Sequence, residues 1–351
     1  MSLPVLTSDF SAFSVPGDSK PGPARISIKD ADGNTVFSND YAQESWFNVM
    51  GLGDVIADHL MSRGASSGRY SVRASRILKG SGAGALGGAA AEHVVASHDG
   101  VFQLSTYPVG TSTPFLESSF LLQAHMLRLP LEPPVEMPVP LWSDGEANMT
   151  EMSYWTEPSD DPALPAEVKS SRTIHDIPDG FYDSPKASAG DFRISPQRRP
   201  PFLSVFSCGA RKLVIEWIPV ESSPTGAPFL FRFTNSFGQK ELLALYGPLS
   251  VSPKAEADSV AVAGRLRRID IQPQPEFTVS AASLSYSEAR LFAFLQYSPS
   301  VELLEGSGLT PQPVVVTAAA GDIADDPLDM SSFKLTFRFA DRRTDPPRRV
   351  S

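Results

Sequence analysis

The stretch Phe229-Leu-Phe-Arg-Phe-Thr-Asn-Ser-Phe-Gly-Gln-Lys-Glu241 decides how the C-terminal part of the chain is interpreted. Its first six residues are mostly aromatic or aliphatic and predict a β-strand. The residues that follow, Asn235–Gly238, predict a turn in which Gly238 adopts a positive φ and Phe237 packs beneath the turn. A second strand is predicted at Glu241–Leu245. We therefore interpret the stretch as a β-hairpin with an architectural rather than a chemical role.

Further short strands are predicted on both sides of this hairpin, separated by Gly, Pro or Asp/Asn turns. Closely spaced short strands are typical of antiparallel β-sandwiches and barrels. One helix is predicted at Ser285–Leu295, where Ser285 and Glu288 form a capping box, and it is expected to cover an open end of the sheet. The predicted strands are Leu203–Phe206, Lys212–Ile218, Phe229–Thr234, Glu241–Leu245, Ala261–Arg268, Glu276–Val279, Val314–Ala318 and Lys334–Ala340.

The N-terminal part of the chain predicts a β domain with one helix. Residues 24–38 alternate in polarity on either side of Asp and Gly turn residues, which is typical of a β-hairpin. The apolar spacing in Gly53–Met61 predicts a helix that Gly64 ends. Arg69–Arg76 and Gly100–Tyr107 alternate in the manner of half-buried strands.

Between these two parts, residues 130–201 contain 13 prolines. We interpret this region as a long, extended Pro-rich arm or linker that reaches a neighbouring molecule, with a disordered insertion as the alternative. Leu141, Trp142 and Trp155 lie in it and are candidate contact residues for a partner. The predicted organisation is a β domain at 1–125, the arm at 126–201, and a second β domain at 202–351 with a covering helix and a basic tail. The predicted fold is thus mainly β, with two short helices.

Composition excludes several classes of protein. The chain has 351 residues, 40 acidic and 30 basic, so its formal charge of −10 argues against nucleic-acid binding as its main role. The single cysteine, Cys208, excludes an intrachain disulfide framework and is expected to be buried. No apolar run approaches the roughly 18 residues of a membrane-spanning helix. The N-terminus lacks the pattern of a signal peptide, which predicts synthesis in the cytoplasm.

No pattern of catalytic, cofactor-binding or metal-binding residues stands out. The five histidines are scattered without metal-ligand spacing, and no nucleophile elbow is present. Gly82, Gly84 and Gly87 match a dinucleotide fingerprint, but no βαβ pattern surrounds them, so a loop is the better interpretation. We expect no catalytic residue, no cofactor and no metal, and therefore a protein that is not an enzyme.

The C-terminal tail, Arg338–Arg349, is basic but interrupted by Asp341 and Asp345. Acidic residues within a basic segment weaken its field toward nucleic acid. We interpret Arg342 and Arg343 as contact residues of a docking tail within an acidic assembly.

The hairpin at Phe229–Glu241 also resembles a segment of a known protein family. An apolar strand ending in Asn-Ser-Phe-Gly, followed by a polar pair and a second strand, is similar to the virion structural proteins of tailed phages and prophages of Bacteroides-type gut bacteria. Short blocks agree with this family in order along most of the chain, although Pro108 follows Tyr107 where the family often has Cys. These blocks are 24–38, Gly51–Ile56, Phe102–Tyr107, Phe115–Leu122, Tyr286–Leu295, Ser298–Leu303, Pro311–Val316 and Phe337–Arg343.

The resemblance implies a structural subunit of a phage tail or baseplate, located in the virion and made in the cytoplasm of the bacterial host. Its implied partners are copies of itself, in a ring or another symmetric assembly, and other virion proteins. Two alternatives remain open. One is a carbohydrate-binding or adhesion module of a particle that uses Trp142 and Trp155 as a sugar-stacking platform. The other is a tail-associated hydrolase, which needs a clustered acid/base pair.

Overall fold

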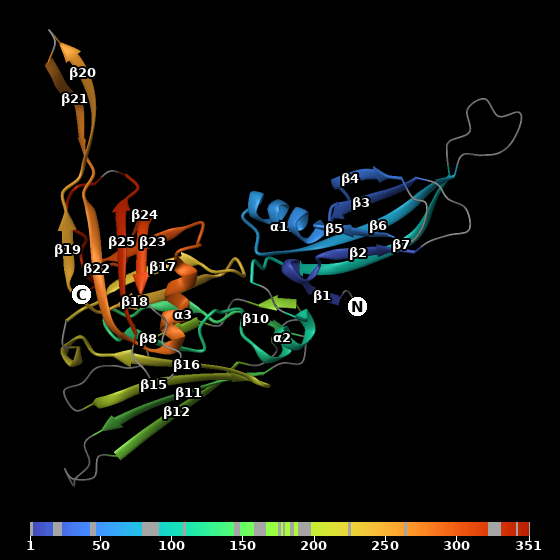
Figure 1. The fold of residues 1–351 in the computed structure, drawn as a ribbon. Helices are drawn as coiled ribbons and strands as arrows, with labels where there is room; N and C mark the ends of the chain where they lie inside the picture. The colour runs from blue at the N-terminus through green and yellow to red at the C-terminus, as the bar shows by residue number, and fades with distance from the viewer. Residues whose placement is uncertain are drawn as a thin grey trace, which may run out of the picture. The chain divides into compact units, whose positions relative to one another are not determined.

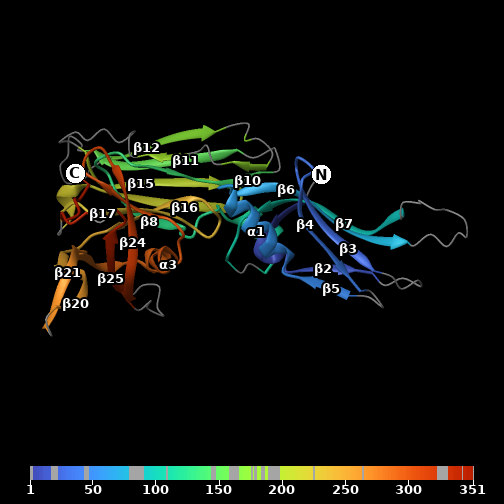
Figure 2. The same ribbon diagram turned by 90° about the horizontal axis from the view of Figure 1, so that it is seen from above.

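The computed structural model describes residues 3–350 apart from 17–22, 43–46, 79–90, 108–109, 144–147, 158–165, 175–176, 178–179, 183–185, 189–197, 224–225, 263–264, 322–330 and 342. The chain forms two compact units, shown as ribbons in Figures 1 and 2. Unit 1 comprises Met1–Glu117 together with Ser236–Gly238, and unit 2 comprises Ser118–Asn235 and Gln239–Ser351.

Unit 1 is built on a five-stranded sheet in the order β1-β7-β6-β3-β4. β1 runs parallel to β7, and the other neighbours are antiparallel. Polarity alternates along β3, so that Ile26 and Ile28 are buried while Arg25 and Ser27 are partly exposed. The strands are β1 (Leu3–Leu6), β3 (Ala24–Asp30), β4 (Thr35–Tyr41), β6 (Ser67–Leu78) and β7 (Ala91–Gln103), with a separate pair formed by β2 (Ala12–Val15) and β5 (Phe47–Met50).

The helix predicted at 53–61 is α1 (Leu52–Ser62), and Gly64 follows it with a φ of +63°. Ile56 and Leu60 of α1 lie in the same buried cluster as Val72 and Phe102 of the sheet. Unit 1 therefore has a core formed between one helix and one sheet, as a small α+β layer arrangement requires. A further helix, α2 (Ser112–Ser118), was not predicted and brings the α-helices among the described residues to three.

Unit 2 contains two larger sheets. One has five strands in the order β12-β11-β15-β16-β8, and the other has seven in the order β18-β17-β23-β24-β25-β22-β19. All pairs within them are antiparallel except β16 with β8. The strands of the first sheet are β8 (Met126–Pro130), β11 (Met149–Glu157), β12 (Ala166–Ile174), β15 (Arg199–Cys208) and β16 (Arg211–Ile218).

The seven-stranded sheet comprises β17 (Phe229–Thr234), β18 (Lys240–Leu245), β19 (Leu249–Ser252), β22 (Glu276–Leu284), β23 (Val301–Glu305), β24 (Thr310–Gly321) and β25 (Ser331–Phe339). Three strand pairs stand beside the two sheets: β10 (Leu141–Ser143) with β13 (Gly180–Tyr182), β9 (Glu136–Pro138) with β14 (Lys186–Ser188), and β20 (Ala255–Val262) with β21 (Arg265–Pro273).

One continuous apolar core holds unit 2 together. Trp217 of β16 is 1% exposed, and Cys208 is buried, as predicted. The predicted second helix is α3 (Tyr286–Leu295), whose Leu291 and Leu295 lie in this core. Its capping box is present, because the Ser285 side chain accepts from the backbone N–H of Glu288 and the Glu288 carboxylate accepts from the backbone N–H of Ser285.

The Pro-rich region is a correction to the sequence interpretation, because most of its described residues form strands of unit 2 rather than an extended arm. Alternate apolar side chains from Leu129 to Leu141 are buried in the core of that unit. Prolines are accommodated at strand ends, as Pro130 is in β8 and Pro138 in β9. The two units meet in sequence at 117/118 rather than 125/126, and β15 runs across the boundary predicted at 201/202.

The fold is mainly β with antiparallel sheets, which confirms the predicted fold class. No helix in the described part of the chain combines the length and the apolar character needed to cross a membrane.

Candidate assembly surface

In the described part of the chain, the most exposed apolar segment is the hairpin β20–β21. It leaves the seven-stranded sheet between β19 and β22 and extends beyond both strands (Figure 1). Leu266 is 80% exposed and Ile271 is 57% exposed. Among the described residues, half of the twelve exposed large apolar side chains lie between positions 251 and 271. We call Val260, Val262, Leu266, Ile269 and Ile271 the hairpin surface.

The register of the hairpin distributes this surface over both of its faces. Val262 lies opposite Arg265 and Ala261 lies opposite Leu266. Residues directly opposite one another in an antiparallel pair project to the same face, and successive residues project to opposite faces. Val262 and Leu266 therefore lie on opposite faces, and neither is covered by the rest of the chain. A two-stranded hairpin without packing is at best marginally stable in water, so this one has the composition of a segment that packs against a partner.

Of the predicted contact residues in the Pro-rich region, Leu141 lies in the core of unit 2, fully buried in β10. Its neighbour Trp142 is half-buried and packs edge-on against Phe181 of β13, with a centroid distance of 4.7 Å. The Trp142 backbone carbonyl accepts a hydrogen bond from the Arg211 guanidinium at 2.9 Å. Leu141 and Trp142 thus pack within unit 2.

Trp155 is on β11, in a different sheet from Trp142. The guanidinium carbon of Arg198 lies 4.6 Å from the centroid of its ring. Its indole N–H donates to Glu157, which also accepts from Arg198. One face of the Trp155 ring is therefore occupied by a cation–π contact, which a sugar stacking on that face would have to displace.

The described part of the C-terminal tail folds onto unit 2. Arg343 forms an ion pair with Glu305 at 2.6 Å and lies over the ring of Phe339. Further along, Arg349 donates to the backbone carbonyls of two loops, and Val350 is fully buried. Arg342 lies outside the described residues. Arg343 thus has a partner within its own chain at the position where sequence reasoning expected a partner protein.

The turn predicted at Asn235–Gly238 is present, with a φ of +71° at Gly238 and a buried Phe237. The tip of the turn belongs to unit 1, where Phe237 stacks on Phe115 at 5.4 Å and its carbonyl accepts from the Gln103 amide. Glycine suits this position because of its φ, and an added Cβ would also make tight contacts of 3.1 Å with the side chains of Leu104 and Ser66.

Asn235 and Glu241 organise the base of this turn within unit 2. The Glu241 carboxylate is buried and accepts hydrogen bonds from the backbone N–H groups of Gln123 and Ala124 and from the Asn235 amide, at 2.9 to 3.1 Å. The Asn235 amide also donates to the Leu121 carbonyl. Burial raises the pKa of Glu241 to about 7, and the three donors only partly oppose this effect. The sequence gives no sign of this network, since Leu121, Gln123 and Ala124 are more than a hundred residues away from Asn235 and Glu241.

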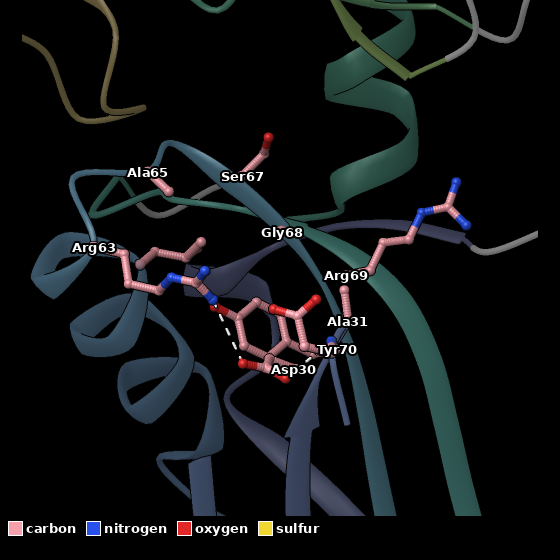
Figure 3. Close-up of a pocket in the computed structure, with 10 residues that line it drawn as sticks. Asp30, Ala31, Arg63, Ala65, Ser67, Gly68, Arg69 and Tyr70 are labelled. Atoms are coloured by element: carbon pink, nitrogen blue, oxygen red, sulfur yellow. Dashed lines mark hydrogen bonds and ion pairs between the residues drawn. The ribbon is translucent and has the colours of Figure 1, made fainter. Parts of the chain in front are cut away.

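Unit 1 has an open pocket of about 300 Å³ beside the β3–β4 turn (Figure 3). Asp30 and Arg63 form an ion pair across it at 3.5 Å, and Arg69 points away from them. The Asp30 carboxylate also accepts from the backbone N–H groups of Asp32 and Asn34, which fixes the turn. These contacts give the pocket a structural role.

Within the described ranges, no group of three or more His, Cys, Asp or Glu residues is arranged to hold a metal ion. The glycines at 82, 84 and 87 lie outside the described residues.

No protein-family model matches the chain, and no curated protein does. Among solved structures, 32% of the chain is similar to 91% of a chain in the virion of a native gene transfer agent (GTA) particle, at 12% identity and a TM-score of 0.21. A similar share matches 90% of a chain in the tail of an empty GTA particle with C6 symmetry, at 16% identity and a TM-score of 0.21. CBD12 from CALX1.2 matches over 59% of this chain and 76% of its own, at 8% identity and a TM-score of 0.15. TM-scores of this size do not establish a shared fold.

Proposed function

We propose that this chain is a structural subunit of a phage tail or baseplate, located in the virion, that acts through contacts between subunits rather than through catalysis. The observation that carries this proposal is the hairpin surface, which a monomer leaves in contact with water. Large exposed apolar patches on soluble proteins mark interaction sites. The sequence blocks that resemble virion structural proteins, above all Phe229–Glu241, favour a virion as the setting.

The geometry of unit 2 is consistent with this role. Among the described strands, β19 at one edge of the seven-stranded sheet and β12 at one edge of the five-stranded sheet each pair with a neighbour on one side only. Unpaired sheet edges are templates for further pairing, and assemblies use them to join subunits. The proposed partners are copies of the same chain and other virion proteins.

The proposal is tested in purified particles from the strain that carries the gene and with the purified full-length chain. We expect quantitative mass spectrometry of the particles to detect the chain in multiple copies. Electron microscopy of the purified chain is expected to show ordered oligomers, such as rings. Absence of the chain from the particles, together with a monomeric state at every concentration, would contradict the proposal.

A further inference from the structure

We propose that the β20–β21 hairpin of one copy docks onto a second copy of this chain. This inference rests on the proposed structural role and names the partner of the hairpin surface. It is argued from the anchoring of the hairpin, its two uncovered faces and its charge distribution.

The hairpin is held firmly at its base. Lys254 and Glu276 form an ion pair at 2.6 Å where the two strands leave the sheet. The backbone N–H of Gln274 donates to the Lys254 carbonyl at 2.7 Å, and β19 pairs with β22 directly below. The base therefore continues the sheet and fixes the point at which the hairpin leaves it. A fixed base lowers the entropic cost of docking the hairpin.

The two faces of the hairpin call for a partner that surrounds it. Val260 and Val262 are 40% and 46% exposed on one face, and Leu266 is 80% exposed on the other. A flat surface could cover only one of these faces. A groove in another protein, or a neighbouring subunit that wraps around the hairpin, covers both and buries the larger apolar area.

The charged residues of the hairpin indicate the kind of partner that it binds. The outer half of the hairpin, residues 259–268, contains Arg265, Arg267 and Arg268 and no acidic residue. A second copy of the chain has 30 basic residues against 40 acidic ones, a formal net charge of −10, so it is acidic on average. Opposite charge steers association and favours matching partners. The charge of a second copy is therefore opposite to that of the outer half of the hairpin.

The inner half of the hairpin argues against a membrane or a nucleic acid as the partner. Glu256, Asp258 and Asp270 balance the three arginines, so the net formal charge of residues 255–273 is zero. Anionic lipid and phosphate surfaces attract segments with a net positive charge. A basic outer half and an acidic inner half instead match a patterned protein surface. Because the hairpin docks onto a different surface of its neighbour, the contact closes a dimer when two copies exchange hairpins and builds a ring or a filament when they do not.

The test compares Leu266→Asp with Tyr297→Ser in the full-length chain by sedimentation velocity over a range of concentrations. Tyr297 is 83% exposed in the same unit, so its variant controls for the loss of an exposed apolar side chain. We expect Leu266→Asp to weaken self-association at least about tenfold and Tyr297→Ser to leave it within about twofold. Both variants are expected to melt at the wild-type temperature, because neither side chain is buried. A second variant, Arg265→Glu with Arg268→Glu, is expected to weaken association and to flatten its dependence on NaCl concentration.

The outcomes separate this inference from the proposed function. If Leu266→Asp and Arg265→Glu/Arg268→Glu associate as tightly as the wild type, docking through the hairpin is overturned even though the chain is found in particles. A wild-type chain that is monomeric in solution but present in particles also overturns docking on a second copy. Binding of the monomer to phosphatidylglycerol vesicles, lost in Leu266→Asp, would overturn it in favour of a lipid surface.

Discussion

Replacing Glu241 with glutamine is expected to remove most of the loss of stability that unit 2 shows between about pH 4.5 and pH 7. The carboxyl group has a pKa of about 7 in the folded chain, against an ordinary value of 4.5, because burial disfavours its charged form. Between these values the folded state binds more protons than the unfolded state. The free energy of unfolding therefore falls as pH rises through this window and is flat above it, a change of about 3 kcal/mol.

The measurement is chemical denaturation of the wild type, Glu241→Gln and a control at pH 5, 6, 7 and 8. Three of the four tryptophans lie in unit 2, so fluorescence reports mainly on that unit. Glu302→Gln is the control, since Glu302 forms a partly exposed ion pair with Arg232. We expect the free energy of unfolding of Glu302→Gln to fall with rising pH as it does in the wild type, and that of Glu241→Gln to lose this dependence on pH. If the free energy of unfolding depends on pH in the same way in the wild type and in Glu241→Gln, then Glu241 does not titrate in this range.

Local patterns were sufficient to predict the strands around Glu241. The predicted strand Phe229–Thr234 coincides with β17, and Glu241–Leu245 lies within β18. Both follow from alternating or continuous apolar residues bounded by turn residues, which is a property of neighbours in sequence. The capping box at Ser285 and Glu288 was predicted for the same reason. The additional ion pair between Glu288 and Arg128 was not, because Arg128 is 160 residues away.

In the Pro-rich region, a strand pattern is present in the sequence, but the prolines within it point to a different structure. Apolar residues occupy alternate positions from Leu129 to Leu141, with one interruption at Pro133, which is the period of a half-buried strand. The prolines between them predict an extended segment instead, because proline removes a ladder hydrogen bond. In the structure the short strands end at prolines, so β8 and β9 retain their pairing.

The assembly surface could be predicted only in part. Ala261–Arg268 was predicted as a single strand, whereas the structure has two antiparallel strands there, β20 ending at Val262 and β21 beginning at Arg265. Ala-Gly is a weak turn signal, and the residues on both sides favour a strand. Whether alternating valines and isoleucines face a core or water depends on what packs against them, which is a property of the whole fold.

Replacing Gly247 with alanine is expected to cost at least about 3 kcal/mol of the free energy of unfolding of unit 2. Gly247 lies in the connection between β18 and β19, and an added Cβ would come within 1.7 Å of the Ser280 carbonyl oxygen. That oxygen is backbone of β22 and cannot rotate away. Two hydrogen bonds hold the two backbone segments close together. The Ser280 N–H donates to the Pro248 carbonyl, and the Gly247 carbonyl accepts from Arg349.

Gly308→Ala is the matched control for this prediction. Gly308 is exposed in the same unit, and the nearest atom to its added Cβ is the Thr310 hydroxyl oxygen at 3.8 Å, an ordinary contact distance. We expect this variant to unfold within about 0.5 kcal/mol of the wild type in the same denaturation experiment. A Gly247→Ala variant as stable as Gly308→Ala would mean that β22 can move away from the β18–β19 connection. The hairpin that leaves the sheet between β19 and β22 would then have a base that can move, and the entropic advantage of a fixed base would be lost.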